Sequence, residues 1–185
     1  IKITNFFSKK EIILLKKIVK EIEIVKPKKN KHMIYKDYHN KQLLLTRTEN
    51  FYDHDSKIRN FLTKKKIINL LTNLIGSKPS LFKDKINWKY PGASGFEPHQ
   101  DAQVWENLYK NVKSFISLTI SIDKTTIKNG CLEIVRKKHK TGLLGDNKSA
   151  IPKSIVKKLK WEKIPTKPGD LIIFGAYTTH RSKKN

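Results

Sequence analysis

The chain has 185 residues, of which 37% are hydrophobic and 9% aromatic, so a wholly disordered chain is excluded and one domain is expected. Lys and Arg number 40 against 16 Asp and Glu, which gives a formal net charge of +24, and no apolar run is long enough to span a membrane. The one cysteine, Cys131, excludes an internal disulfide and a zinc site built from cysteines, and it favours a reducing, cytoplasmic compartment.

So large a positive charge raises the hypothesis of a basic nucleic-acid-binding module. Only four of the 40 basic residues are arginines, although arginine is the residue that binds bases and phosphates through paired hydrogen bonds. Lysine, isoleucine and asparagine, which A/T-rich codons specify, are all abundant. We therefore interpret the charge chiefly as a bias of the coding sequence and keep the nucleic-acid-binding module as an alternative function.

The pattern of the first 79 residues is mostly helical. Ser8 and Glu11 have the spacing of a capping box, and apolar residues follow at helical spacing as far as Ile22. A second helical pattern runs without a break over residues 56–75 and predicts one further helix. The segment 31–56 between them is polar and aromatic, with a short apolar run at Leu43–Leu45, and we assign no element to it.

From residue 80 onward, short β-prone runs alternate with turn signals. Predicted strands cover residues 80–90, 115–122, 131–135 and 171–174. Helices that are followed by short strands are typical of an α+β domain whose core is mainly β, arranged as a sheet sandwich or a barrel.

His99 and Asp101 are the most informative pair in the chain. On a strand, residues i and i+2 point to the same face, so the two would present an imidazole and a carboxylate side by side. His180 follows the last predicted strand, and distant strands meet in an antiparallel barrel. Two histidines and one carboxylate on one face of a metal leave positions open for substrate, an arrangement that suits non-heme Fe(II). The alternative is a surface pair at 99 and 101 and an unrelated histidine at a strand end.

Five segments, in order and with suitable gaps, resemble the phytanoyl-CoA dioxygenase (PhyH) family of Fe(II)/2-oxoglutarate oxygenases. They are Pro98–Asp101 (PHQD), Lys128–Glu133 (KNGCLE), Lys138–Gly142 (KHKTG), Pro168–Asp170 (PGD), and His180–Ser182 (HRS) with Asn185 behind it. The match covers residues 80–185 well, and residues 5–11 and 47–51 resemble the family's N-terminal half more loosely.

The resemblance implies a double-stranded β-helix, which is a cupin-like jelly roll, with flanking N-terminal helices. We expect a single oxygenase domain over 1–185, with a mostly helical flank at 1–79 and the jelly-roll core at 80–185. In the family, an arginine that binds the far carboxylate of 2-oxoglutarate follows the second histidine by about ten residues. We therefore expect this arginine, together with the final strand of the core, beyond Asn185.

The resemblance also implies the chemistry. Fe(II) would be held by His99, Asp101 and His180, with 2-oxoglutarate and O2 as cosubstrates. 2-Oxoglutarate would be decarboxylated to succinate and CO2, and a C–H bond of a small-molecule substrate would be hydroxylated. The iron and its cosubstrate supply the chemistry, and the protein supplies position and shelter from water.

Four residues are cosubstrate candidates by their position. Ser182 lies two residues after His180 on the same strand face, and Asn87 lies on the strand before the metal motif. Thr119 shares an unusually polar strand face, and Arg47 aligns loosely with a basic contact in the family's N-terminal half. The alternative for Thr119 is a solvated strand face, for Asn87 a turn residue, and for Arg47 a surface cation. Arg181 adjoins His180 and is expected to point to the opposite face.

Three further residues are substrate candidates for an anionic or zwitterionic small molecule. Gln103 and Trp105 continue the strand face of Asp101, and Lys85 shares a face with Asn87. The alternative is that Trp105 packs in the core and that Lys85 is one of 36 lysines.

Two other functions stay open on the same fold. A halogenase-like or inactive relative is one, but a halogenase would carry Ala or Gly where this chain has Asp101. A non-catalytic, metal-binding cupin-like barrel is the other. Neither the substrate nor the oligomeric state can be predicted from these residues, because one fold hosts many activities.

Overall fold

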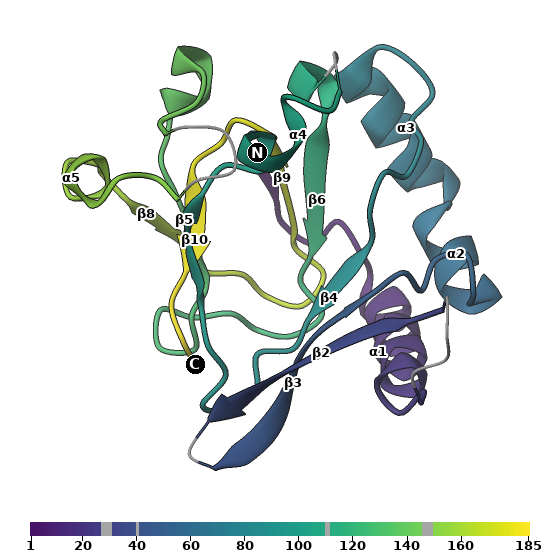
Figure 1. The fold of residues 1–185 in the computed structure, drawn as a ribbon. Coiled ribbons are helices and arrows are strands. Elements are labelled where there is room, and N and C mark those ends of the chain that lie inside the picture. Colours follow the sequence, from purple (N-terminus) through teal and green to yellow (C-terminus); the bar gives the residue numbers. More distant parts are fainter. Residues whose placement is uncertain (27–30, 40, 110–111, 146–149) are drawn as a thin grey trace. The chain divides into compact units, whose positions relative to one another are not determined.

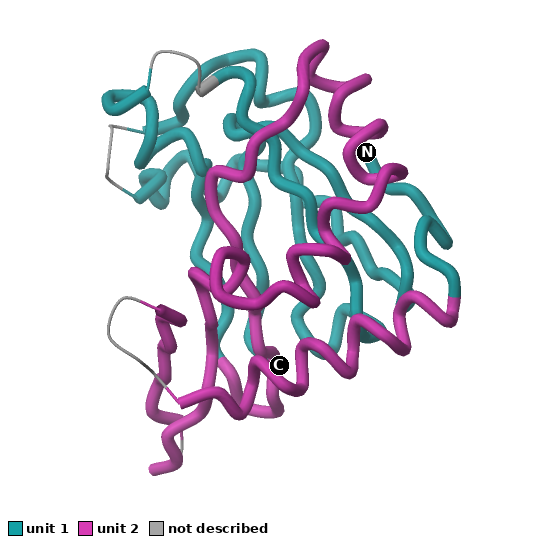
Figure 2. Tube along the Cα trace, turned by 90° about the vertical axis from the view of Figure 1, so that its right-hand side faces the viewer, with its two compact units in different colours: residues 1–8, 94–185 teal, residues 9–93 magenta. Residues whose placement is uncertain are grey.

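The computed structural model describes residues 1–26, 31–39, 41–109, 112–145 and 150–185. The chain divides into two compact units, of which unit 1 comprises Ile1–Ser8 and Ser94–Asn185 and unit 2 comprises Lys9–Ala93 (Figure 2). Within the described ranges, no helix combines the length and the apolar character that crossing a membrane requires.

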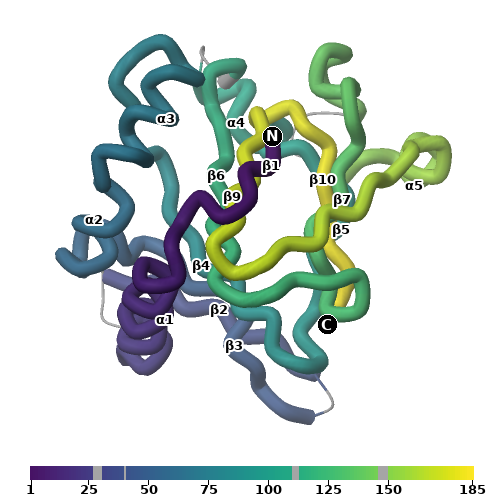
Figure 3. The backbone as a smooth tube through the Cα atoms, turned by 180° about the vertical axis from the view of Figure 1, so that it is seen from behind, coloured from purple at the N-terminus to yellow at the C-terminus, as the bar shows by residue number. Residues whose placement is uncertain are grey.

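Unit 1 is built on two antiparallel sheets (Figures 1 and 3). The first has the order β1-β9-β6, and the second has the order β5-β10-β7-β8. Short helices and 3-10 turns connect the strands. The strands are β1 (Lys2–Ile3), β5 (Phe96–His99), β6 (Ile116–Ile120), β7 (Leu132–Ile134), β8 (Glu162–Ile164), β9 (Leu171–Gly175) and β10 (His180–Ser182), and the helical elements are α4 (Ala102–Trp105), η1 (Val112–Ser114), η2 (Lys138–Thr141) and α5 (Lys153–Val156).

The strands expected at 115–122, 131–135 and 171–174 are confirmed as β6, β7 and β9. β9 lies between β1 and β6, and its first three residues, Leu171–Ile173, are all buried. Such a run without alternation is what a central strand needs when it is covered on both faces. The mixed fold with antiparallel sheets therefore agrees with the α+β class expected from the sequence.

Unit 2 contains three helices among its described residues, α1 (Lys9–Glu23), α2 (Ser56–Leu62) and α3 (Lys65–Ile75). α1 begins directly after Ser8, where the cap was expected, and it buries the apolar residues that carry the helical pattern. Glu11 of α1 forms ion pairs with Lys64 and Lys66 at 2.9 and 2.6 Å.

The prediction of one unbroken helix over 56–75 is wrong, because the chain leaves the helical conformation between α2 and α3. Thr63 ends α2, and Lys64 has an extended backbone with φ −53° and ψ 138°. In an unbroken helix, Ile67 would lie about 120° around the axis from Phe61. Both side chains are buried here, so the break lets two short helices each bury their own apolar face.

A three-stranded sheet in unit 2 was not anticipated. β2 (Met33–His39) and β3 (Gln42–Glu49) form a hairpin in the segment that predicted no element, and β4 (Lys85–Asn87) adds to β3. β4 is also much shorter than the strand expected at 80–90. No residue of β2 is buried. A strand without a buried face does not need to alternate apolar and polar residues, and β2 lacks this pattern, which is what reveals strands in a sequence. The segment 1–79 is thus less helical than expected.

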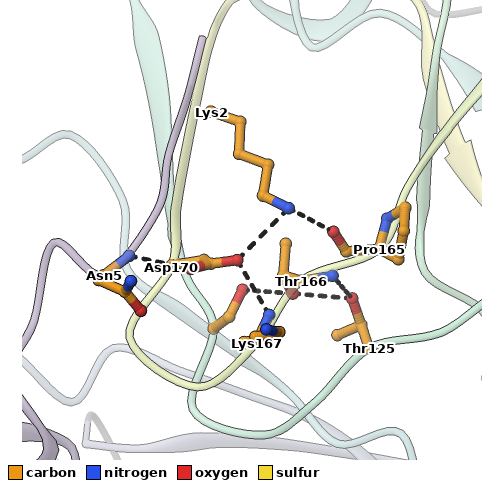
Figure 4. A network of polar contacts seen from close by, with 8 residues as sticks. Lys2, Asn5, Thr125, Pro165, Thr166, Lys167 and Asp170 are labelled. Carbon is orange, nitrogen blue, oxygen red and sulfur yellow. Dashed lines mark hydrogen bonds and ion pairs between the residues drawn. The ribbon is translucent and has the colours of Figure 1, made fainter.

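Asp170 organises one end of unit 1 through a network of polar contacts (Figure 4). It ends the Pro168-Gly169-Asp170 turn, in which Gly169 has the positive φ of 94° that favours glycine. Its side chain accepts hydrogen bonds from the backbone N–H groups of Asn5 and Lys167 at 3.0 and 2.9 Å, and Lys2 Nζ lies 3.4 Å from it. Asp170 therefore ties the turn to the N-terminal segment that carries β1.

The same contacts determine the charge state of Asp170. Burial opposes ionisation, but the hydrogen bonds from Lys167 and Asn5 and the contact with Lys2 outweigh it and lower the pKa of Asp170 below its ordinary value. A lowered pKa in the folded state stabilises the fold above the unfolded pKa of about 4. This stabilisation is lost as the pH falls through the folded pKa.

We expect Asp170→Asn to lower the free energy of unfolding at pH 7 by about 2 to 4 kcal/mol, because an amide nitrogen would then face a backbone donor. Urea denaturation at pH 7 and at pH 3 measures the effect. The difference from the wild type should shrink at pH 3, because this pH lies below the unfolded pKa of about 4 and the stabilisation falls away from there toward the folded pKa. Asp53→Asn, at an exposed position, is the matched control, and an equal loss in both variants would contradict the role of the network.

Candidate metal centre

The pairing of β5 with β10 brings the two histidines of the sequence pattern together. His99 and His180 are direct partners in the antiparallel ladder, and their ring centroids lie 4.1 Å apart. The ladder shifts register between His180 and Ser182. At Gly95, just before β5, a Cβ atom would lie only 2.1 Å from the carbonyl oxygen of Ser182. Only glycine therefore allows β10 to approach this closely.

Asp101 reaches the same place by a different route from the one expected. It does not lie on a strand, because β5 ends at His99 and Asp101 has the helical backbone angles φ −57° and ψ −34° at the start of α4. The backbone N–H of Ala102 then donates to the carbonyl of Ala176 at 3.0 Å and holds the start of α4. The expectation that His99 and Asp101 meet is confirmed, but the shared strand face given as its reason is wrong.

Three ligand atoms converge at this point. Asp101 Oδ1 lies 3.8 Å from His99 Nε2 and 3.8 Å from His180 Nε2. In the part of the chain that the structure describes, these residues form the one group of three whose ligand atoms lie close enough to hold a metal ion, within 4.8 Å of one another. His180 is largely buried against Phe174, with ring centroids 4.7 Å apart, whereas His99 and Asp101 are about a third exposed, at 34% and 30%. The centre therefore has a solvent-facing side.

Backbone carbonyls determine which ring nitrogen of each histidine is available. His99 Nδ1 lies 2.7 Å from the carbonyl oxygen of Glu97, and His180 Nδ1 lies 2.8 Å from that of Thr178. A carbonyl can only accept, so each Nδ1 carries a proton, and in a neutral imidazole Nε2 is then the nitrogen whose lone pair faces Asp101. Hydrogen bonds of this kind orient the histidine ligands of metal sites.

The second carboxylate oxygen of Asp101 is also held. Ser117 Oγ on β6 donates a hydrogen bond to Asp101 Oδ2 at 2.8 Å. Ser117 is not among the site residues predicted from the sequence. Its alternation with Thr119 was the one signal for it in the sequence.

The donor set fits a divalent cation. When both imidazoles are neutral and no cation is bound, two imidazole lone pairs and a carboxylate oxygen face one another, which is electrostatically unfavourable. Two imidazole nitrogens and one carboxylate oxygen on one side of a metal, with the other side open, are the ligand set of non-heme Fe(II) oxygenases.

Of the cosubstrate candidates, Ser182 and Thr119 lie in unit 1 with the metal ligands. Ser182 is half-buried, and its Oγ accepts a hydrogen bond from the backbone N–H of Phe96 at 3.3 Å. Thr119 is exposed on β6, two residues beyond Ser117. Both roles stay predictions.

Arg47, Asn87 and Lys85 lie in unit 2, on β3 and β4, where Arg47 and Asn87 are register partners. Arg47 lies over the ring of Tyr35 at 3.9 Å, and its Nε is 3.2 Å from the buried carboxylate of Glu49. Their roles toward cosubstrate and substrate stay predictions.

The remaining substrate candidates, Gln103 and Trp105, are not on a strand. The prediction that they continue the strand face of Asp101 is therefore wrong. Both lie on α4, where side chains follow helical spacing. Gln103 is buried, and Trp105 packs against the cluster of Ala102 and Ala176. Their contact with a substrate stays a prediction.

Gln100, between the two ligands of the motif, is almost fully buried and joins three segments of unit 1. Its Nε2 donates to the carbonyls of Gly142 and Tyr177 at 3.0 and 2.7 Å, and its Oε1 accepts from the backbone N–H of Leu144 at 2.7 Å. Its own N–H donates to Gln103 Oε1 at 2.9 Å. The glutamine thus anchors the loop of Gln100 and Asp101, called the metal loop from here on, to the rest of the unit.

Arg181 points away from the metal centre, as expected. Its Nε donates to the buried Glu133 at 2.7 Å, and its guanidinium lies 4.0 Å from the ring centre of Trp161. Both contacts lie on the face of β10 opposite to that of His180. Arg181 is therefore a structural residue of the sheet.

A mixed fold with antiparallel sheets and a His-Asp-His centre defines the class of non-heme iron oxygenases. Residues 1–185 match the family described as phytanoyl-CoA dioxygenase (PhyH), and the chain belongs to this family.

Two curated relatives act on phosphorus compounds according to their names. A methylphosphonate hydroxylase of Gimesia maris is 34% identical over 186 residues, covering 100% of this chain and 70% of the relative. A 2-aminoethylphosphonate dioxygenase of the uncultured bacterium HF130_AEPn_1 is 38% identical over 144 residues, covering 77% of this chain and 54% of the relative. The chain thus spans between about half and seven-tenths of the length of these relatives.

The fold also resembles that of a solved enzyme. The non-heme alpha-ketoglutarate-dependent carbocyclase SnoK from nogalamycin biosynthesis superposes with a TM-score of 0.83 at 14% identity, covering 100% of this chain and 73% of SnoK. Together, the family match and the names of the relatives agree with the expected class of 2-oxoglutarate-dependent dioxygenases, and SnoK supports the fold.

We expect Gln100→Ala to lower the free energy of unfolding by about 2 to 4 kcal/mol, because it leaves buried backbone groups without partners. Urea denaturation measures the loss. Gln42→Ala, at an exposed position at the start of β3, is the matched control and should change stability by less than about 0.5 kcal/mol. Similar values for the two variants would show that Gln100 does not anchor the loop.

Proposed function

We propose that this protein is an Fe(II)/2-oxoglutarate-dependent hydroxylase of a small molecule. The observation that carries the proposal is the convergence of His99 Nε2, His180 Nε2 and Asp101 Oδ1, each with its other polar atom hydrogen-bonded. We propose further that the sheets β1-β9-β6 and β5-β10-β7-β8 are the two halves of a double-stranded β-helix. A single oxygenase domain over 1–185 is part of the same proposal, and the family match over this range supports it.

The proposed substrate is a small organophosphonate. The names of the two relatives, methylphosphonate hydroxylase and 2-aminoethylphosphonate dioxygenase, support this choice, at 34% and 38% identity. The net charge of +24 favours attraction of any anion.

The residues of this chain would act by binding and orienting. His99, Asp101 and His180 hold Fe(II) on one side, and the hydroxyls of Ser182 and Thr119 offer hydrogen bonds to 2-oxoglutarate. When bound, Fe(II) with 2-oxoglutarate and O2 supplies the oxidation, in which 2-oxoglutarate becomes succinate and CO2 and one oxygen atom enters a substrate C–H bond. The backbone carbonyls of Glu97 and Thr178 keep both imidazoles in the metal-binding tautomer throughout.

Replacing a metal ligand tests the reaction. We expect His99→Ala and Asp101→Ala each to lower Fe(II)-dependent succinate formation by more than about 100-fold, because two ligands do not hold the metal in place. His139→Ala removes an exposed histidine of η2 and is the matched control. Turnover that survives in both ligand variants would contradict the proposal, and metal binding without any succinate from the wild type would indicate a non-catalytic barrel.

Substrate class is tested separately with the wild-type enzyme. Methylphosphonate and 2-aminoethylphosphonate should each stimulate succinate formation well above the rate without substrate. Acetate and β-alanine, which replace the phosphonate by a carboxylate, are the matched controls and should stimulate it little. Equal stimulation by the carboxylates, or none by the phosphonates, would contradict the proposed substrate while leaving the reaction class intact.

A further inference from the structure

Ser117 contacts the metal centre without being a ligand. Its hydroxyl lies 2.8 Å from Asp101 Oδ2, whereas Asp101 Oδ1 lies 3.8 Å from both histidine Nε2 atoms. The two oxygens of one carboxylate thus have different partners. We propose that Ser117 is a positioning residue that keeps Asp101 a one-oxygen ligand, so that the metal retains enough open positions for 2-oxoglutarate. This inference rests on the proposed metal site.

The direction of the hydrogen bond follows from the groups involved. An ionised carboxylate only accepts, so the single O–H of Ser117 must donate to Asp101. Hydrogen bonds to a charged oxygen are shorter and stronger than bonds between neutral groups. The bond therefore stabilises Oδ2 where it is and leaves Oδ1 as the oxygen that faces the two imidazoles.

The hydrogen bond from Ser117 to Asp101 matters because it affects how many coordination positions of the metal stay open. A carboxylate binds a cation through one oxygen or through both. In a six-coordinate centre, three protein atoms would leave three positions open for 2-oxoglutarate and O2. A second oxygen from Asp101 would occupy one of these positions and compete with 2-oxoglutarate.

The backbone holds Ser117 firmly in place for this task. β6 pairs with β9 at every residue from Ile116 to Ile120, and Ser117 is the partner of Phe174. The ring of Phe174 in turn lies against that of His180. Ser117 therefore reaches Asp101 from the sheet that does not carry the histidines, and it links that sheet to the metal loop.

Ser121, the residue directly after β6, provides a control. Its Oγ donates a hydrogen bond of similar length, 2.7 Å, but to the neutral hydroxyl of Thr166. Ser117 is half-buried and Ser121 is buried, and loss of either hydroxyl removes one hydrogen bond of similar length. Only the loss of the Ser117 hydroxyl should affect the metal centre.

The test compares Ser117→Thr with Ser117→Val, two β-branched side chains of nearly equal size that differ in the hydroxyl. Mn(II) replaces Fe(II), because it binds the same ligands, and titration calorimetry measures the Kd of Mn(II) and then of 2-oxoglutarate on the Mn(II)-loaded protein. We expect Ser117→Val to raise the Kd of 2-oxoglutarate about tenfold or more, the order of one lost hydrogen bond to a charged group. The Kd of Mn(II) should rise by less than about threefold, because the second oxygen of Asp101 would then contact the metal. Ser117→Thr should keep both values near those of the wild type, and so should Ser121→Ala.

Each result decides one point. Equal Kd values of 2-oxoglutarate for the Thr and Val variants would overturn the role of Ser117 and leave the proposed function standing. A wild type that binds neither Mn(II) nor 2-oxoglutarate would overturn the proposed function itself. With Fe(II), the KM for 2-oxoglutarate should rise in Ser117→Val more than kcat falls, whereas a loss of kcat alone would contradict the positioning role.

Discussion

The antiparallel pairing of β5 with β10 is the constraint on which the metal centre depends. It makes His99 the direct partner of His180, although the two lie far apart in the sequence, and it brings their rings within 4.1 Å of each other. The ladder forms because Gly95 leaves room for the backbone of Ser182. Asp101 can complete the centre only because β5 ends at the metal-facing His99 and the chain then turns into α4, which begins at Ala102.

Polar groups of the backbone and of side chains bind each ligand residue at the atom that does not face the centre. Carbonyls two residues upstream orient both imidazoles, Ser117 holds the second oxygen of Asp101, and Gln100 joins the metal loop to two other segments. Ligands that are supported in this way are preorganised, so little conformational entropy remains to be lost when a metal binds. The design suits an enzyme that must keep part of its metal open for two cosubstrates.

Much of unit 1 could be predicted because its signals are local or carried by the family motifs. The apolar run of β9, the alternation of β6 and the glycine of the Pro168–Asp170 turn each follow from the conformation of a few neighbouring residues. Unit 2 was harder. β2 exposes or half-buries all its residues and so lacks a strand pattern, and the break at Thr63 and Lys64 interrupts an apolar pattern that still looks helical.

The sequence by itself predicted the donor set of the candidate centre, because only a few residue types bind iron and the family motifs point to His99, Asp101 and His180. It could not determine how these residues meet. The expected strand through Asp101 is the start of a helix, and the role of Ser117 depends on a contact between two strands that are distant in sequence. Pairing and side-chain contacts of this kind arise from the packing of the whole chain, and no local pattern of residues encodes them.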